Sequence, residues 1–332
     1  AGHLSRRYLT RPVVFGEILA GLLFGPTLLN LLGWPLFAPQ GNHAWDLAAM
    51  VTALAHIGVL LLMFVAGLET NLAQLRTVGR TALWTAVLGV AAPLLLGAGT
   101  GAVFGLPLTE SLFIGAVLTA TSVSISAQTL LEIGRLNSRE GATILGAAVI
   151  DDVLGIIILA FVIAFGTTQH GADAKVLGLV DQVAIPICRL CGVPSSHPLI
   201  QVLVVVLLMG LFFAGALLIG ARGLGAVVRW ADRLHASHIV PATALVLVFA
   251  LAVAAEYVGQ VAAITGAYLA GVFLAPSPYK AEIARGIHPF TYALFVPVFF
   301  MSIGLGADAR QILQGHLPFV LAIIGVAILT KV

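Results

Sequence analysis

Two adjacent carboxylates, Asp151 and Asp152, lie inside an otherwise apolar run, "AAVIDDVLGIIILAFVIAF", at residues 147–165. Lys331 is a third ionisable residue deep within an apolar segment. An ionisable side chain at the centre of a transmembrane helix costs about 2.5–3.5 kcal/mol on insertion scales, so such groups persist where they face a partner or a water-filled cavity. These three residues are therefore the first candidates for chemistry.

The two carboxylates are expected to have different partners. Neighbouring residues on an α-helix point about 100° apart. An ion pair that joins two helices would explain one Asp and Lys331, but it leaves the second Asp unexplained. A carboxylate that faces a cavity can exchange a proton, and once ionised it is a hard oxygen ligand for a small monovalent cation. A site that holds either a proton or a cation is what an exchanger needs.

A segment rich in Thr, Ser and Ala, "GAVLTATSVSISAQTL" at residues 115–130, could supply further oxygen ligands. A broken membrane helix frees backbone carbonyls that can bind a cation, and Thr119, Thr121 and Ser122 lie where such a break is expected. The alternative is a face of small residues that lets two helices pack closely. The spacing alone does not separate these two alternatives.

Two further carboxylates lie near the ends of apolar segments. Glu17 follows "RPVVFG" and Glu69 ends "LLLMFVAGLE". Each could be an interfacial cap of its helix, or each could line the path by which an ion reaches the centre of the membrane.

The composition predicts an all-α polytopic membrane protein. Hydrophobic residues make up 60% of the chain and charged residues only 9%, against about 25% charged in an ordinary soluble domain. The net charge of +2 gives no basis for nucleic-acid binding. Apolar segments long enough to span or nearly span a bilayer recur along the chain, at residues 13–31, 47–68, 82–104, 111–133, 142–166, 199–221, 239–257, 260–275, 289–306 and 317–332.

Basic residues predict the orientation of these segments in the plasma membrane, because loops on the cytoplasmic side carry an excess of Lys and Arg. One set of alternate connections is rich in basic residues: Arg6, Arg7, Arg11, Arg76, Arg80, Arg135, Arg139, Arg222, Arg229, Arg233, Lys280 and Arg285. The intervening connections carry only Lys175, Arg189 and Arg310. The first set is therefore expected on the cytoplasmic side, and Lys331 is the basic residue that this topology leaves inside an apolar segment.

The long connection at residues 167–198 is expected to form an outer loop, and it holds the two cysteines of the chain, Cys188 and Cys191. Their C-x-x-C spacing, with His170 and His197 nearby, could bind a metal. A single such pair is a weak metal signal, so a disulfide or two free thiols is the favoured alternative. No metal site is predicted elsewhere, and no cofactor is expected.

The whole of residues 1–332 is expected to be one transmembrane transporter domain. The first residues, "AGHLSRRYLTRPVV", look like the remnant of a helix, and the apolar segment from residue 317 stops soon after Lys331. We therefore expect about ten full or nearly full spans and an N-terminal remnant, in a domain truncated at both ends.

Several ordered motifs resemble the monovalent cation:proton antiporter-2 family, and in particular its NapA-type sodium/proton antiporters. The resemblance covers nearly the whole chain. The motifs that carry it are "RPVVFGEILAGLLFGPTLL", "IGVLLLMFVAGLE", "TATSVSISAQTLLEIGRLNS", "GAAVIDDVLGIIILA", "AAITGAYLAGVFLA" and "FVPVFFMSIGLGAD".

The resemblance implies an inverted-repeat antiporter fold with a core domain and a dimerisation domain, and a homodimer that works by elevator-like alternating access. It implies that Asp152 is the carboxylate that binds the ion and that Asp151 pairs with Lys331. The segment that contains Thr119, Thr121 and Ser122 matches the broken, crossing helix of the family, whose second broken helix would follow Lys331.

The function expected on this basis is electrogenic exchange of a monovalent cation, Na+ in the first place and K+ or Li+ otherwise, for protons. In this family an Asp–Asp pair resembles the electrogenic exchangers, whereas Asn–Asp or Gln–Asp accompanies electroneutral exchange or Kef-type potassium efflux. A Kef-type potassium/proton efflux system is the alternative. An intramembrane aspartyl protease is disfavoured, because its two carboxylates must face each other from different helices to share a proton.

Overall fold

The computed structural model describes residues 13–33, 47–166, 198–234, 237–308, 310 and 317–331. Every regular element in these ranges is a helix. The first half contains α2 (Val13–Phe24), η1 (Leu31–Gly33), α3 (Leu47–Glu69), α4 (Leu72–Val103), α5 (Leu108–Thr119), α6 (Val123–Glu132) and α7 (Arg139–Gly166). The second half contains α9 (Pro198–Ile219), η3 (Gly220–Leu224), α10 (Gly225–Asp232), α11 (Ile239–Tyr257), α12 (Ala263–Leu274), α13 (Lys280–Phe290), η4 (Thr291–Phe295), α14 (Val296–Gly306) and α16 (Leu317–Lys331).

The prediction of a polytopic membrane protein is confirmed. Within the described ranges, 7 helical stretches are long and apolar enough to cross a membrane, and three shorter apolar helices, α2, α12 and α16, accompany them. Each apolar segment expected from the sequence contains one of these helices. The 167–198 connection, with Cys188, Cys191, His170 and His197, lies outside the described residues apart from Pro198, which begins α9.

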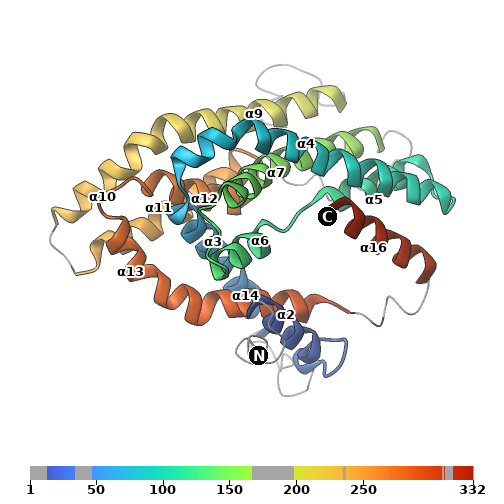
Figure 1. Cartoon of the computed structure of the whole chain (residues 1–332), viewed down its shortest axis with the longest axis horizontal. Coiled ribbons are helices and arrows are strands. Elements are labelled where there is room, and N and C mark those ends of the chain that lie inside the picture. The colour runs from blue at the N-terminus through green and yellow to red at the C-terminus, as the bar shows by residue number, and fades with distance from the viewer. Residues whose placement is uncertain are drawn as a thin grey trace, which may run out of the picture.

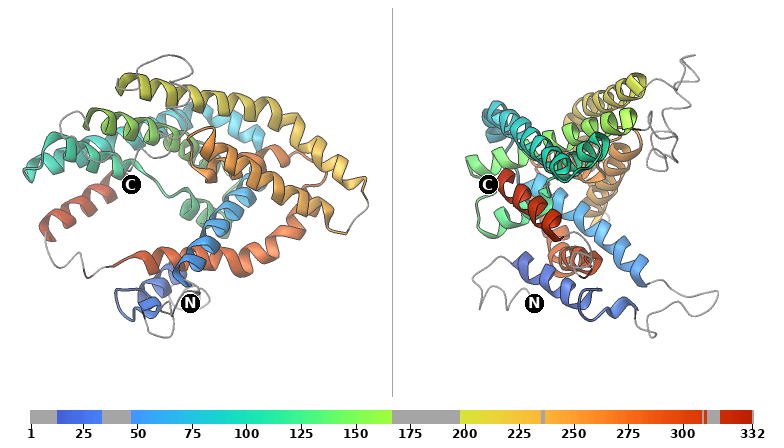
Figure 2. Two further views of the ribbon diagram at one scale, coloured as in Figure 1. Left: turned by 180° about the vertical axis from the view of Figure 1, so that it is seen from behind. Right: turned by 90° about the vertical axis from the view of Figure 1, so that its right-hand side faces the viewer.

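Contacts divide most of the helices into two groups, and Figures 1 and 2 show α3 and α6 near the middle of the molecule. The α7 group consists of α4, α5, α7 and α16, with α4 in extensive contact with α5 and α7. The α12 group consists of α2, α3, α11, α12, α13 and α14, with its closest packing between α3 and α12 and between α2 and α14. The break after α5 leads the chain from the α7 group to α6, which lies against α3.

Small residues allow the closest of these helix crossings. A Cβ atom on Gly67 of α3 would collide with the carbonyl oxygen of Tyr268, and one on Gly271 of α12 would collide with the carbonyl oxygen of Phe64. Lipid tails give little hydrophobic drive for helix association, so close van der Waals contact between backbones supplies much of it. The glycines thus fix α12 firmly on α3.

Two long helical stretches are interrupted by one wide turn each. The π-helical turn η3 separates α9 from α10, and the π-helical turn η4 separates α13 from α14. A π turn inserts a residue into an α-helix and changes which face the following turns present. The chain therefore keeps a continuous helix while it turns α14 towards α2.

An apolar cluster connects the two groups beside the Asp pair. It brings together side chains from α3, α6, α7 and α12: Met63, Ala66, Val123, Ala127, Leu130, Leu145, Ala148, Tyr268 and Val272. Ala148 lies one helical turn before Asp152, so this cluster borders the candidate site on one side.

Candidate functional site

The helix that contains the Thr/Ser-rich segment is broken where the sequence predicts a break. α5 ends at Thr119 and α6 begins at Val123. Between them Ala120 has ψ 119° and Ser122 has ψ 95°, which are extended and not helical values. The backbone groups beside the break therefore lack the regular helical hydrogen bonds.

The hydroxyl groups beside the break bond mainly to the local backbone. Thr119 Oγ1 donates to the carbonyl oxygen of Ala116 at 2.7 Å, and Thr121 Oγ1 donates to the carbonyl oxygen of Thr119 at 3.1 Å. Thr119 is 2% exposed, whereas Ser122 is exposed. The Thr119 carbonyl oxygen is therefore an acceptor outside the regular hydrogen-bond pattern of α5.

Lys331 reaches this break from α16. Its Nζ donates to the carbonyl oxygen of Thr119 at 3.2 Å and to the hydroxyl oxygen of Thr121. A longer contact of 3.5 Å joins Nζ to the carbonyl oxygen of Gly89 in α4. The lysine that topology leaves inside an apolar segment therefore bridges α4, α16 and the broken helix.

Asp151 lies on the side of α7 that faces this bridge. Its side chain is 8% exposed, and it interacts electrostatically with the Thr121 hydroxyl and the Lys331 ammonium. One of its oxygens, Oδ1, has no hydrogen-bond partner among the described residues. The hydrogen bonds of Lys331 go to the break, so the direct ion pair between Asp151 and Lys331 stays a prediction.

Asp152 points to the other helix group. Its Oδ2 accepts a hydrogen bond of 3.1 Å from Thr265 Oγ1, in the first turn of α12. Thr265 is 2% exposed. As expected from the 100° between successive helical residues, the two carboxylates have different surroundings.

The break, α7 and α12 are neighbouring elements that carry oxygen atoms of three kinds: carboxylate, hydroxyl and freed carbonyl. A Cβ atom on Gly155 of α7 would lie 3.6 Å from Thr119 Oγ1, so α7 passes directly beside the end of α5. Hard cations prefer such oxygen ligands. No group of three or more His, Cys, Asp or Glu side chains that could hold a metal ion occurs in the described part of the chain.

The sequence-based reasoning did not identify Thr265. Its sequence signal is modest: it is the first polar side chain in the apolar segment "AAITGAYLAGVFLA". Its importance depends on α12 packing beside α7, and that packing is not readable from either segment by itself.

A second set of carboxylates lies nearer the expected cytoplasmic ends of the helices. Glu132, at the end of α6, accepts hydrogen bonds from Val13 N at 2.8 Å and from Gln128 Nε2 at 3.1 Å. Glu17 of α2 lies within electrostatic range of Glu132. Glu132 was not among the predicted residues, although it lies two residues after the Thr/Ser-rich segment.

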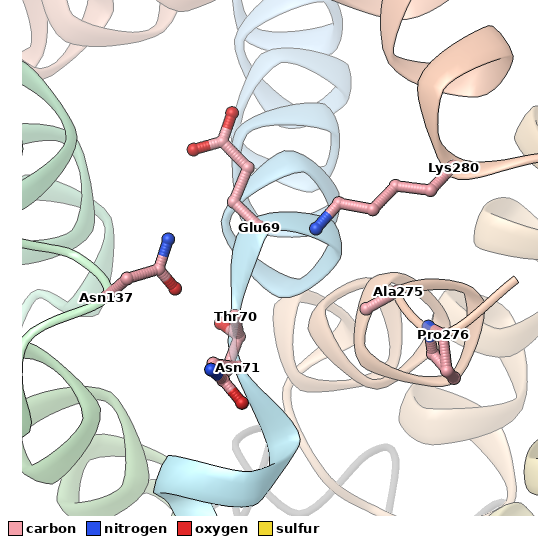
Figure 3. Close-up of a pocket in the computed structure, with 7 residues that line it drawn as sticks. All are labelled: Glu69, Thr70, Asn71, Asn137, Ala275, Pro276 and Lys280. Atoms are coloured by element: carbon pink, nitrogen blue, oxygen red, sulfur yellow. The ribbon is translucent and has the colours of Figure 1, made fainter.

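Glu69 lies at the end of α3, where its carboxylate is 3.7 Å from His288 Nε2. It also lines a pocket of about 470 Å³, shown in Figure 3. In that view Lys280 extends towards the end of α3, and the Glu69 carboxylate points away from it. The lining residues come from α3, α13, the connections next to them and the connection between α6 and α7: Glu69, Thr70, Asn71, Asn137, Ala275, Pro276 and Lys280.

Comparisons with known proteins identify the family of this chain. The profile of the family described as sodium/hydrogen exchanger, transmembrane, matches residues 1–332. The Na(+)/H(+)-K(+) antiporter GerN of Bacillus cereus is 36% identical over 331 residues, which cover 100% of this chain and 74% of that protein. The Na(+)/H(+) antiporter of Enterococcus hirae is 32% identical over 330 residues, which cover 99% of this chain and 75% of that protein.

A solved structure shares the fold. The sodium proton antiporter MjNhaP1 of Methanocaldococcus jannaschii matches with a TM-score of 0.56 at 17% identity, over 99% of this chain and 73% of that one. The described helices, the family match across the full chain and the two similar antiporters lead to one conclusion. This chain belongs to the sodium/hydrogen exchanger family of multi-pass membrane antiporters, which are transporters and not enzymes.

Proposed function

We propose that this chain exchanges Na+ for protons by alternating access, and that Asp152 is the group that binds them in turn. The observation that carries this proposal is the position of Asp152 within the apolar helix α7, where its carboxylate accepts a hydrogen bond from Thr265 of α12. An ionised carboxylate supplies charge for the cation, and the Thr119 carbonyl and neighbouring hydroxyls supply neutral oxygens.

One binding site that is used alternately couples the two fluxes. On one side of the membrane Asp152 loses its proton and binds the cation. After the α7 group moves relative to the α12 group, the cation leaves on the other side and a proton replaces it. Because both ions require the same carboxylate oxygens, neither ion crosses twice in succession without the other.

Asp151 and Lys331 give the exchange its electrogenic character in this proposal. Lys331 carries a positive charge that Asp151 and the broken helix stabilise, and loss of its proton during the cycle would move additional charge. Because the sequence motifs resemble those of NapA-type antiporters, we expect the α7 group to be the mobile core and the α12 group to be the dimerisation domain of a homodimer.

Na+ is the first substrate to test, and K+ is the second. The names of the two similar antiporters include Na(+), and one of them also includes K(+). Proton movement driven by equal gradients of Na+, K+ and Li+ in proteoliposomes would rank the three cations. The Kef-type alternative requires K+ to be clearly preferred.

The decisive variant is Asp152→Asn, which keeps the shape of the side chain and removes its charge. We expect proteoliposomes with this variant to lose Na+-driven proton movement, measured with a pH-sensitive dye. Glu110→Gln is the matched control, because Glu110 is an exposed carboxylate in the first turn of α5. Full activity of Asp152→Asn would end the assignment of Asp152.

A further inference from the structure

A single hydrogen bond links the candidate ion-binding carboxylate to the opposite helix group. Thr265 Oγ1 donates to Asp152 Oδ2 at 3.1 Å, and the two residues are 113 positions apart in the chain. Thr265 belongs to α12, whose glycine Gly271 packs tightly on α3, whereas Asp152 belongs to α7. The bond exists only while α12 and α7 are in this relative position.

Apolar side chains surround the bond on the expected outer side of the membrane. Val153, Ile156 and Ile157 follow Asp152 along α7 and pack against a cluster from α9, α11 and the turn before α12. The buried members of that cluster are Val205, Met209, Phe212, Ala216, Ala255 and Val261. The contact between Asp152 and Thr265 is therefore the polar end of an apolar seal.

The pocket lies at the opposite ends of the same helices. Glu69 ends α3, and Ala275 and Pro276 follow α12, so the pocket is on the side that the basic residues predict to be cytoplasmic. Neither Asp152 nor Thr265 lines this pocket, so the pocket lies apart from the bond between them.

We propose that Thr265 is a positioning residue for cation binding at Asp152: its hydroxyl orients the carboxylate while α7 and α12 are in this relative position. This inference rests on the proposed exchange at Asp152 and adds a residue from the opposite helix group. The hydroxyl acts in one conformation of the cycle and separates from Asp152 in the other.

The chemistry of the bond decides the direction of its effect. A hydroxyl that donates to a carboxylate stabilises the ionised form, and an ionised carboxylate has acceptor positions for several partners. One position on Oδ2 is used by Thr265, so Oδ1 stays available for a cation. Without the hydroxyl, a proton competes more effectively with the cation for Asp152.

Other charged groups near Asp152 act on the same equilibrium and remain in place when Thr265 is changed. Asp151 is its charged neighbour on α7, and Lys331 of α16 interacts in turn with Asp151. The described parts of α9 and α12 carry no charged side chain. A change in pH dependence on substitution of Thr265 therefore reports the lost hydroxyl.

The test compares Thr265→Val, which keeps the shape and removes the hydroxyl, with Thr265→Ser, which retains a hydroxyl. The measurement is the KM for Na+ as a function of pH, from each side of oriented vesicles that contain the whole protein. For Thr265→Val we expect the KM for Na+ on one side of the membrane to rise about tenfold at acidic pH, the scale of one hydrogen bond to a charged group, because the bond forms in one conformation of the cycle. The KM on the opposite side should stay unchanged, and Thr265→Ser should restore the wild-type profile.

Thr291→Val is the matched control, because Thr291 is fully buried and its Oγ1 has no hydrogen-bond partner among the described residues. Thermal unfolding of all three variants in detergent separates a loss of stability from a change in binding. Equal KM profiles for Thr265→Val and the wild type, or an equal rise on both sides, would overturn the role of Thr265. Those results would leave the loss of exchange in Asp152→Asn untouched, so the two proposals fail separately.

Discussion

At the scale of single residues, Asp151 and Asp152 show how the angle of about 100° between neighbouring helical residues gives two similar groups different surroundings. Asp152 bonds to Thr265 across the boundary of the helix groups, whereas Asp151 faces Thr121 and Lys331 inside the α7 group. Burial of a carboxylate requires compensation by charge or hydrogen bonds. Different compensating partners for the two carboxylates are the physical basis for giving them different roles.

Asp151→Asn is expected to be milder than Asp152→Asn. The substitution removes the negative charge that stabilises the Lys331 ammonium, so exchange should continue while each cycle moves less charge. Charge displacement on a solid-supported membrane, compared at matched cation flux, measures the difference. An undiminished current at matched flux would contradict the role given to Asp151.

At the scale of elements, the crossing of α3 and α12 determines where Thr265 lies. Gly67 and Gly271 let the two backbones touch, and α12 presents its first turn to α7. A side chain at either glycine would have to push the helices apart, because the atoms that it meets are backbone atoms. The position of Thr265 in the first turn of α12 thus depends on the backbone contacts of Gly271 with α3, almost two helical turns away.

Gly271→Ala is therefore expected to destabilise the protein by about 1–3 kcal/mol, the usual cost of overpacking a tight contact. Thermal unfolding in detergent is the measurement, with a lowered Tm as the expected result. Gly99→Ala in α4 is the control, because a Cβ at Gly99 meets nothing within 4 Å. Equal Tm values for the two variants would show that α3 and α12 are less tightly packed than described.

Part of the site can be predicted from the sequence because it depends on local composition. The Thr/Ser-rich segment around Thr121 and the carboxylates in an apolar helix can be recognised from the sequence, however the helices pack against one another. The partners of these residues are not local: Thr265 meets Asp152 only through the position of α12, and Lys331 meets the break only through the position of α16. The sequence also located the membrane helices, because apolar length is a property of each segment alone.

At the scale of the whole molecule, Glu132 makes a second contact between α6 and the α12 group. Its carboxylate accepts the backbone N–H of Val13 at the start of α2, 119 residues away. A negative charge at a helix N-terminus is stabilised by the free N–H groups and the helix dipole. This contact lies at the expected cytoplasmic end, far from the outer seal beside Thr265.

Glu132→Gln removes the charge and leaves one oxygen for the two donors, Val13 N and Gln128 Nε2. We expect the first turn of α2 to open more often, with amide hydrogen exchange in residues 13–24 about tenfold faster, the effect of losing one charged hydrogen bond. Exchange followed by mass spectrometry measures this, with Glu110→Gln as the control. Unchanged protection of α2 would show that Glu132 does not hold it.

The bridge formed by Lys331 has one more consequence. Its ammonium already lies on the Thr119 carbonyl oxygen and the Thr121 hydroxyl, two oxygens of the kind that a cation would seek. In the proposed site, the lysine therefore competes with the cation for these oxygens. Because the lysine is attached to α16, its effective concentration at the break does not depend on the solution. A cation that uses these two oxygens would displace the ammonium, so its apparent affinity would include the cost of moving one of the protein's own side chains.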